Sequence, residues 1–303
     1  MKILILGYSK IVRKRVLNVI KNKKIKLFIA SKTYKKKIPG AKKQFNSYET
    51  AIKKVKPNLV YISLPNSKHY FWAKKSLYHN FDTIVDKPIT TNKKQLKDLI
   101  ELSNKNKKIL VEATYFNYHQ QFRKIKNIYK KEKYKNISTK FIIPTPDKKS
   151  ILISKKFQGG VFMDMGPYMA SLPRLFKLKN VIKKKVEIFK NKKNLIIAIK
   201  FIFIFKEGKY YGLFKFGGRY KNEIKIHDRN KIGIIKRAFS PPDNENMFLK
   251  MKIKNKELSI KFKKDDCFRN FFNEVLKKIK TKEHDFYHKR MIEDCNFRFN
   301  LMR

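Results

Sequence analysis

The stretch Lys2–Gly7, KILILG, decides the fold of this chain. A short apolar run that ends at a glycine is typical of a strand buried on both faces, as in a parallel sheet. Apolar residues then recur at helical spacing over Lys10–Asn22. A buried strand that turns at Gly7 into a helix is the first unit of a doubly wound parallel sheet.

Strand-like and helix-like segments continue to alternate as far as residue 118. Further apolar runs that predict strands are Ile25–Ser31, Leu59–Leu64, Thr83–Val85 and Ile109–Ala113. The segments with helical spacing between them are Tyr48–Val55, His69–Asn80 and Lys93–Asn104. This alternation predicts βαβ units, and therefore a Rossmann-type α/β domain with a doubly wound parallel sheet over residues 1–118.

The pattern changes after residue 118. Helices are predicted at Gln121–Lys131, Phe162–Phe176, Phe268–Ile279 and Tyr287–Met302. Strands are predicted at Ile137–Ile143, Val186–Lys190, Leu195–Phe205, Tyr210–Phe216, Asn222–His227, Ile232–Ala238 and Phe248–Ile253. This meander predicts an α+β domain over residues 119–303, with a large, mostly antiparallel open sheet. The C-terminal helix is expected to pack back on the first domain.

The charge of the chain is its most conspicuous property. It carries 76 Lys and Arg against 23 Asp and Glu, a formal net charge of +53. A nucleic-acid-binding protein concentrates such charge in a stripe or tail and favours arginine, whereas here lysine is spread over almost every segment. The abundance of Ile, Asn, Phe and Tyr, which have A/T-rich codons, favours compositional drift over selection for a nucleic-acid partner. A field this positive still attracts anions.

Other features limit the class of protein. Cys267 and Cys295 make no disulfide framework, which favours a reducing compartment and core positions for both. The run Leu195–Phe205 is too short to span a membrane, and the N-terminal residues lack the pattern of a signal peptide. We therefore expect a cytoplasmic protein. His284 and His288 lie four residues apart without the acidic partners of a metal site, so we expect surface histidines and no metal.

The turn after the first strand is where a doubly wound sheet binds a dinucleotide. The usual signature is G-x-G-x-x-G, whose glycines let backbone N–H groups approach a pyrophosphate at a helix N-terminus. Only Gly7 is present here, with Ser9 and Val12 in the other two places. We expect Ser9 to donate its hydroxyl to a phosphate, so that the site is altered rather than lost. An ordinary strand-to-helix turn is the alternative interpretation.

The end of the second strand distinguishes NAD from NADP. An NAD-specific site carries an acid there for the ribose 2′-hydroxyl. This chain has Ser31 and Lys32, with Lys35 close behind, and a hydroxyl and an ammonium attract a 2′-phosphate. The pattern favours NADP as the cofactor, but lysine is so common in this chain that NAD stays open.

Further short motifs follow along the chain. Each one alone is weak evidence, but their order and spacing together are specific. They are Pro65-Asn66 followed by His69, Asp86-Lys87-Pro88, Glu112-Ala113, and the stretch GGVFMDMGPY from Gly159 to Tyr168. With them the chain resembles the Gfo/Idh/MocA oxidoreductases, the family of glucose–fructose oxidoreductase and inositol dehydrogenase. Members of that family show Pro-Asn-x-x-His, Glu-Lys-Pro, Glu-Ala and Gly-Gly-x-x-x-Asp-x-Gly-x-His or -Tyr in this order.

The resemblance implies an NADP(H)-dependent enzyme that transfers a hydride at a carbonyl or secondary alcohol of a sugar. The cofactor-binding residues that it implies are Gly7, Ser9, Lys10, Ile11, Ser31, Lys32, Leu64, Pro65, Asn66, His69, Asp86, Lys87, Glu112 and Ala113. The segments around Arg219 and Arg237 resemble, more loosely, members that act on nucleotide-linked keto-sugars. The substrate-binding residues implied are Lys87, Tyr115, Asp164, Tyr168, Arg219 and Arg237. Ordinary surface or interface positions are the alternative for both arginines.

Chemistry suggests roles for three of these residues. Lys87, on a loop fixed by Pro88, polarises a carbonyl and stabilises the developing alkoxide. Asp164 and Tyr168 lie four residues apart and share one face of the predicted helix. A tyrosine delivers a proton when a neighbouring cation makes it more acidic, and Lys87 is the candidate cation. We expect Lys87, Asp164 and Tyr168 to be catalytic; the alternatives are a helix-capping acid and a half-buried aromatic.

Some positions depart from the family pattern. Residues 117–120, Asn-Tyr-His-Gln, stand where Arg-x-x-Pro is common, and Asp86 stands where Glu is usual. With the two missing glycines, these departures support a second interpretation, a non-catalytic member that binds the dinucleotide as a sensor or partner-binding protein. A basic nucleic-acid-binding protein is a third. The enzyme is favoured, as a homodimer or homotetramer, because an open antiparallel sheet with one uncovered face usually packs against a partner.

Overall fold

The computed structural model describes residues 1–21, 24–34, 36–131, 133–254 and 256–302. Two positions named above, Asn22 at the end of the first predicted helix and Lys35, lie outside these ranges. The chain divides into two compact units. Unit 1 comprises Met1–Ala113 and Phe271–Ile292, and unit 2 comprises Thr114–Asn270 and Glu293–Arg303.

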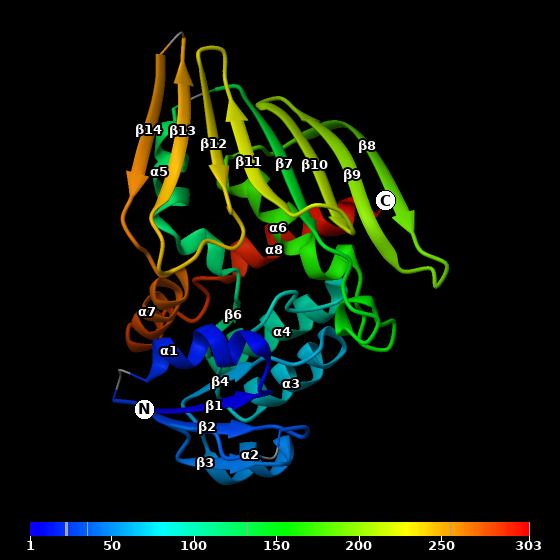
Figure 1. Cartoon of the computed structure of the whole chain (residues 1–303). Coiled ribbons are helices and arrows are strands. Elements are labelled where there is room, and N and C mark those ends of the chain that lie inside the picture. The colour runs from blue at the N-terminus through cyan, green and yellow to red at the C-terminus, as the bar shows by residue number, and fades with distance from the viewer. Residues whose placement is uncertain (22–23, 35, 132, 255, 303) are drawn as a thin grey trace. The chain divides into compact units, whose positions relative to one another are not determined.

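Unit 1 is built, in its described residues, on a six-stranded sheet in the order β3-β2-β1-β4-β5-β6 (Figure 1). Its strands are β1 (Lys2–Leu6), β2 (Lys26–Ala30), β3 (Lys43–Phe45), β4 (Leu59–Ile62), β5 (Asp82–Val85) and β6 (Leu110–Glu112). All neighbours pair in parallel. All residues of β4 and β5 are buried, which explains why β4 appears in the sequence as a continuous apolar run.

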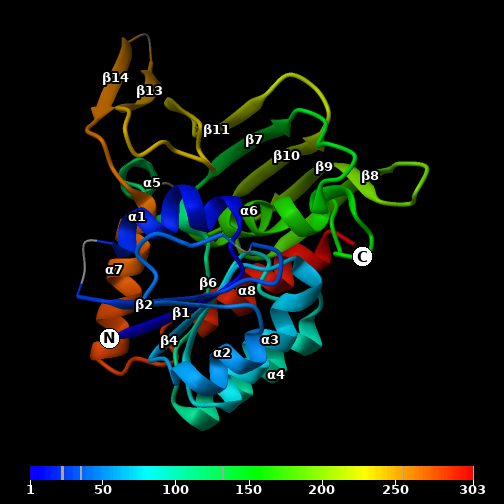
Figure 2. The ribbon, with the colours of Figure 1, turned by 60° about the horizontal axis from the view of Figure 1, so that its bottom comes forward.

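Helices cover both faces of this parallel sheet. They are the π-helical turn η1 (Val12–Val16) that continues into α1 (Leu17–Ile20), then α2 (Tyr48–Val55), α3 (Asn66–Tyr78) and α4 (Lys93–Asn106). In Figure 2, α1 lies on one side of the sheet and α2, α3 and α4 lie on the other. On β4, Tyr61 packs edge-on against Phe272 of α7 (Cys267–Lys280), with ring centroids 5.9 Å apart. The predicted doubly wound α/β fold is confirmed.

Unit 2 is built, in its described residues, on an eight-stranded sheet in the order β14-β13-β12-β11-β7-β10-β9-β8 (Figure 1). Its strands are β7 (Lys135–Ile143), β8 (Val181–Lys190), β9 (Ile196–Phe205), β10 (Gly208–Phe216), β11 (Lys221–His227), β12 (Lys231–Lys236), β13 (Met247–Ile253) and β14 (Lys256–Phe262). Strands β7 and β10 pair in parallel, and the other neighbours pair antiparallel. The predicted mostly antiparallel sheet is confirmed.

The helical elements of unit 2 pack on one face of its sheet. They are η2 (Tyr115–Tyr118), α5 (Gln120–Ile128), η3 (Ile151–Ile153), α6 (Val161–Leu175) and the later part of α8 (His288–Asn300). Helix α6 contacts β9 and β10, and α5 contacts β13. The core between these layers is rich in fully buried aromatic side chains, among them Phe201, Phe203, Tyr210 and Phe214.

Two strands were not predicted from the sequence. Strand β3 is only three residues long, and β14 mixes polar and apolar residues at the edge of its sheet. An edge strand is paired on one side only and needs no continuous apolar run. The apolar signal that indicates buried strands is therefore weak at both positions.

Candidate active site

The turn after β1 accepts only a glycine. Gly7 has a φ of +99°, and a Cβ atom on it would lie 2.1 Å from the carbonyl oxygen of Ser63. Its N–H donates to the carbonyl oxygen of Ala30, 2.9 Å away. The backbone is thereby packed tightly between β2 and the end of β4. This geometry fits the first position of a dinucleotide-binding turn.

Ser9 at the start of the first helix is held inside unit 1. Its Oγ accepts from the N–H of Val12, at 3.2 Å, and lies 2.7 Å from the Oγ of Ser63. Because Ser63 donates its own proton to Asp86, at 2.5 Å, Ser9 must be the donor between the two serines. In this arrangement the Ser9 hydroxyl is engaged by Ser63. The expected contact from this hydroxyl to a phosphate stays a prediction, and it would require the hydroxyl to turn away from Ser63.

Asp86 ties the ends of β4 and β5 together. Its carboxylate accepts from the Ser63 hydroxyl and, on the other oxygen, from the Tyr61 hydroxyl. Burial raises the pKa of Asp86, and the two hydroxyl donors act against that rise. The carboxylate is thus fully engaged within the domain, and its position fixes the residue that follows it, Lys87.

His69 holds two loops at the carboxyl end of the parallel sheet. The ring is buried, with Nδ1 lying 2.8 Å from the carbonyl oxygen of Pro88 and Nε2 2.7 Å from that of Leu64. Burial lowers the pKa of His69, while the two carbonyls and Asp86 favour the charged ring. With both nitrogens facing carbonyls, His69 contributes to a cofactor site through the loops that it positions.

Lys87 lies on a loop that is fixed on both sides. Asp86 precedes it, and Pro88 follows it after a cis peptide bond. Pro88 is held by His69, and the N–H of Ile89 donates to Glu112 at 2.8 Å. Contacts from the ends of β4, β5 and β6 therefore determine where the half-buried Lys87 stands.

The other predicted cofactor residues of unit 1 also follow the carboxyl ends of its strands, the edge where such sheets bind ligands. Lys10 and Ile11 begin the first helix, residues 64–66 connect β4 to α3, and Ala113 follows β6. Ser31 is only 4% exposed, and its Oγ accepts from the N–H of Tyr34 at 3.1 Å. Lys32 is exposed, with its Nζ 5.4 Å from the ring centre of Tyr48.

In unit 2, Asp164 and Tyr168 lie on α6 as predicted, and both are half-buried. The Tyr168 ring packs against the rings of Phe116, Phe141 and Phe239, at centroid distances of 5.4, 5.4 and 5.2 Å. Asp164 is in the first turn of the helix and donates its N–H to the carbonyl oxygen of Gly160. The aromatic cluster leaves the Tyr168 ring little freedom to rotate.

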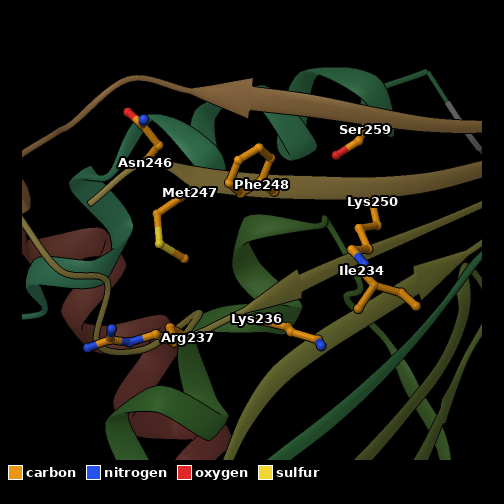
Figure 3. Close-up of a pocket in the computed structure, with 8 residues that line it drawn as sticks. All are labelled: Ile234, Lys236, Arg237, Asn246, Met247, Phe248, Lys250 and Ser259. Atoms are coloured by element: carbon orange, nitrogen blue, oxygen red, sulfur yellow. The ribbon is translucent and has the colours of Figure 1, made fainter.

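Arg237 follows β12 and comes two residues before Phe239, whose ring packs on Tyr168. It pairs with Glu245 at 3.2 Å and lines a cavity of about 490 Å³ (Figure 3). The other residues that line the cavity are Ile234, Lys236, Asn246, Met247, Phe248, Lys250 and Ser259. Phe248 and Lys250 of β13 are exposed, while Leu249 between them faces the core. The cavity thus opens on the face of the sheet that α5 does not cover.

The last two predicted substrate residues occupy different surroundings in unit 2. Tyr115 stacks on Phe268 with ring centroids 3.7 Å apart and an interplanar angle of 20°. Arg219 is exposed in the turn between β10 and β11. Among the described residues, the ion pair of Arg237 is with Glu245 and not with Asp164.

The structure also places the cysteines and one of the two paired histidines. Cys267 and Cys295 are buried, as predicted. His288 is buried rather than exposed, and its Nε2 lies 3.1 Å from the hydroxyl of Ser103 on α4. Within the described ranges, no group of three or more His, Cys, Asp or Glu side chains is arranged to hold a metal ion. Among these residues, every helix is too short or too polar to span a membrane.

Known proteins similar in sequence include sugar-modifying oxidoreductases. A dTDP-3,4-didehydro-2,6-dideoxy-α-D-glucose 3-reductase of Actinomadura kijaniata is 24% identical over 132 residues, covering 43% of this chain and 40% of the relative. A D-xylose 1-dehydrogenase (NADP⁺) of Haloferax volcanii is 25% identical over 140 residues, covering 45% and 43%. The chain thus aligns with about two fifths of the length of these relatives.

Solved structures match over almost the whole chain. KijD10, a 3-ketoreductase from A. kijaniata in complex with NADP and TDP-benzene, superposes with a TM-score of 0.86 at 16% identity, covering 97% of this chain and 94% of that one. An aldose–aldose oxidoreductase from Caulobacter crescentus gives 0.86 at 15% identity, covering 100% and 96%. At these identities the likeness shows the fold.

The N-terminal part of the chain matches the model of a known protein family. Residues 1–115 match the model of the oxidoreductase family with an NAD-binding Rossmann fold named Gfo/Idh/MocA. The matched range contains Gly7, the His69 and Asp86 contacts and Lys87. By this match residues 1–115 are assigned to the NAD-binding Rossmann domain of the Gfo/Idh/MocA oxidoreductase family.

Proposed function

We propose that this protein is an NADP(H)-dependent oxidoreductase that interconverts a ketone and a secondary alcohol on a sugar or a nucleotide-linked keto-sugar. The observation that carries the proposal is the Lys87 loop, which Asp86, His69 and Glu112 hold at the ligand-binding edge of a Rossmann sheet. The keto-sugar reductase and the NADP⁺-dependent D-xylose dehydrogenase among the relatives support the same class of reaction.

The residues of unit 1 fit a dinucleotide. Gly7 allows the backbone to pack where no side chain fits, and the first helix begins at Lys10, after Tyr8 and Ser9. We propose that this turn, Ser31–Lys32, residues 64–66, Asp86–Lys87 and Glu112–Ala113 hold the cofactor. When bound, the nicotinamide ring supplies or accepts the hydride.

Side chains of this protein would stabilise the charge that develops during the reaction and would transfer the proton. We propose that the Lys87 ammonium polarises the substrate carbonyl and stabilises negative charge that develops on its oxygen. Tyr168 would donate a proton to that oxygen in the reducing direction and accept it in the oxidising direction. Asp164, on the same helix face, would orient the substrate hydroxyls by accepting hydrogen bonds.

The test is steady-state kinetics with NADPH on a panel of dTDP-linked keto-sugars and free sugars. Lys87→Ala and Tyr168→Phe should each lower kcat/KM at least about a hundredfold, the usual contribution of general acid–base groups. Lys68→Ala, on the exposed surface of α3, serves as the matched control and should leave the rate unchanged. Unchanged turnover in both site variants would refute the assigned roles.

One observation favours a second candidate, a non-catalytic member that binds the dinucleotide as a sensor. The Ser9 hydroxyl is engaged by Ser63, and the buried Val12 fills the place of the third glycine. This candidate is preferred if NADPH binds in a saturable manner and no substrate of the panel is turned over.

We also propose a homodimer or homotetramer. Its support is the face of the eight-stranded sheet opposite the helices, on which Phe248 and other side chains are exposed. Light scattering in solution would decide the oligomeric state, and a monomer at all concentrations would contradict the proposal.

A further inference from the structure

Strand β11 has a polar residue at a position that faces the core of unit 2. Asn222, Ile224 and Ile226 alternate along this strand as its buried positions, and Asn222 is only 5% exposed. Burying an amide costs free energy unless its polar atoms are hydrogen-bonded, whereas an apolar side chain would simply continue the pattern of the strand. An asparagine at this position therefore points to a specific role for its contacts.

The amide of Asn222 holds the bend that follows β12. Its Oδ1 accepts from the backbone N–H of Phe239 at 3.0 Å. Its Nδ2 donates to the Ser240 hydroxyl at 2.8 Å and to the Tyr220 hydroxyl at 3.1 Å, and these two hydroxyls lie 3.1 Å apart. One side chain of the sheet thus fixes two successive residues of a segment that lies between two strands.

The ring that this bend carries packs on the proposed proton donor. Phe239 is buried, and its ring centroid lies 5.2 Å from that of Tyr168 on α6. The rings of Phe116 and Phe141 also pack on Tyr168. Both of them contact Phe239 as well, at centroid distances of 5.2 and 5.3 Å. The four rings form one packed cluster, so a shift of Phe239 changes the space that is left for Tyr168.

The three phenyl rings around Tyr168 differ in how their own positions are set. Phe141 lies in β7, whose backbone pairs with β10 on one side and β11 on the other. Phe116 lies in the helical turn η2. Phe239 lies in a bend, and its N–H donates to a side chain, that of Asn222. The position of the Phe239 ring therefore depends on a single side chain more than the positions of the other two rings do.

We propose that Asn222 is a positioning residue for Tyr168: it fixes the bend at Phe239, and the Phe239 ring holds the phenol in the orientation that proton transfer requires. A proton donor must lie within hydrogen-bond reach of the atom that it protonates, so a displaced phenol transfers its proton more slowly. The inference rests on the proposed function, in which Tyr168 donates the proton, and adds the residues that hold it in place.

The first measurement follows the Tyr168 ring and needs no substrate. The protein is labelled with meta-fluorotyrosine at its 15 tyrosines, and Tyr168→Phe assigns the Tyr168 resonance in the fluorine NMR spectrum. Asn222→Leu removes the acceptor of the Phe239 N–H and should move this resonance. Asn222→Asp should restore it, because a carboxylate still accepts from that N–H and from the two hydroxyls.

Phe205→Leu is the control for a general loosening of the core. Phe205 is buried in the same hydrophobic core, and its ring packs on Phe203 and Phe297. This variant should leave the Tyr168 resonance in place.

The second measurement is steady-state kinetics with NADPH on the panel of dTDP-linked keto-sugars and free sugars. Rates are expressed per NADPH-binding site found by calorimetry, which removes the effect of partly unfolded protein. Asn222→Leu and Phe239→Leu should each lower kcat about tenfold or more, with a change in the Kd for NADPH of less than about twofold. Asn222→Asp should restore kcat, and Phe205→Leu should keep it.

Each other result has a defined meaning. If the Tyr168 resonance is the same in Asn222→Leu and in the wild type, or if Phe205→Leu moves it equally, the inference is overturned. A kcat per site that stays unchanged in Asn222→Leu or in Phe239→Leu also overturns it. If Asn222→Leu moves the resonance and Asn222→Asp restores it, while the wild type turns over no substrate of the panel, Asn222 positions the ring as inferred and the proposed function fails.

Discussion

Single side chains in unit 1 act mainly by holding loops in place. His69 is buried, and its two ring nitrogens face the carbonyl oxygens of Leu64 and Pro88. Asp86 accepts from two hydroxyls at the ends of β4 and β5. These contacts leave Lys87, between Asp86 and Pro88, as the residue that the loop presents. We conclude that the motif residues around Lys87 serve to position it.

Replacing His69 should therefore destabilise the loops at the carboxyl edge of the parallel sheet. His69→Leu removes the ring N–H donor that faces these carbonyl oxygens in an apolar environment and should lower the free energy of unfolding by about 2–4 kcal/mol, as measured in urea. His79→Leu, at the half-exposed end of α3, is the control and should change it by less than about 0.5 kcal/mol. Equal losses in the two variants would show that the carbonyl contacts of His69 do not stabilise the loops.

A second buried histidine makes stability depend on pH. Burial lowers the pKa of His288, with Asp285 acting against that shift. The native state therefore binds a proton less readily than the unfolded chain, so the free energy of unfolding should fall as the pH drops below about 6.5. Urea titrations of the wild type and of His288→Gln at pH 8 and pH 5.5 test this, and the variant should lose less stability on acidification. The same loss in both proteins would exclude His288 as the cause.

At this scale the sequence predicts which residue types gather but not how their hydrogen bonds are arranged. The order of the motifs indicated His69, Asp86, Lys87 and Glu112. That Ser9 donates to Ser63 depends on a contact 54 residues away. The burial of His288 depends on Ser103, which is 185 residues away. Contacts between residues so far apart in the sequence form only when the chain is folded, so no local sequence pattern predicts them.

The turn between β1 and the first helix is the element on which the cofactor proposal depends most. Gly7→Ala would put a methyl group 2.1 Å from a carbonyl oxygen at a positive φ, and should destabilise the protein by about 3 kcal/mol or more. Gly40 is a matched control, because its φ is +80° but the nearest atom to an added Cβ is 4.0 Å away. Gly40→Ala should cost only about 1 kcal/mol of strain. Similar losses in urea unfolding would contradict the close approach of Gly7 to β4.

Helix α6 is held in unit 2 by a largely buried ion pair. Arg174 makes two hydrogen bonds to Asp294 of α8, at 2.7 and 2.8 Å, and the Ser171 hydroxyl lies 3.3 Å from the same carboxylate. Removing one partner leaves the other charge buried and unpaired. Asp294→Leu should therefore lower the free energy of unfolding by about 3 kcal/mol.

The double variant Arg174→Met/Asp294→Leu should recover most of that loss, because it leaves no unpaired charge. Urea unfolding of the single and double variants gives the interaction energy directly. If the two losses simply add, the pair does not couple α6 to α8.

Elements were predicted where burial imposes a pattern and missed where it does not. The buried strand β4 (Leu59–Ile62) and the strand β9 (Ile196–Phe205) both appear in the sequence as apolar runs. The three-residue strand β3 and the edge strand β14 leave no such signal. The π-helical turn Val12–Val16 was also not predicted, since its apolar spacing differs little from that of an α-helix over one turn.

At the scale of the whole molecule, two causes could make this protein bind an anion: its high net charge, or a specific binding site. A net charge of +53 attracts any nucleotide or nucleic acid at low salt. Such attraction weakens steeply as salt is added and shows no fixed stoichiometry. A dinucleotide site adds close contacts from the Gly7 turn and from the first helix, and these contacts persist when exposed charges are screened.

The most direct measurement of the central claim is a calorimetric titration of the wild-type protein with NADPH at physiological salt. We predict saturable binding of one NADPH per chain that survives a further rise in ionic strength. Heat that does not saturate, or that vanishes as salt is raised, would show that only the net charge attracts the nucleotide and would contradict a cofactor site at the edge of the parallel sheet.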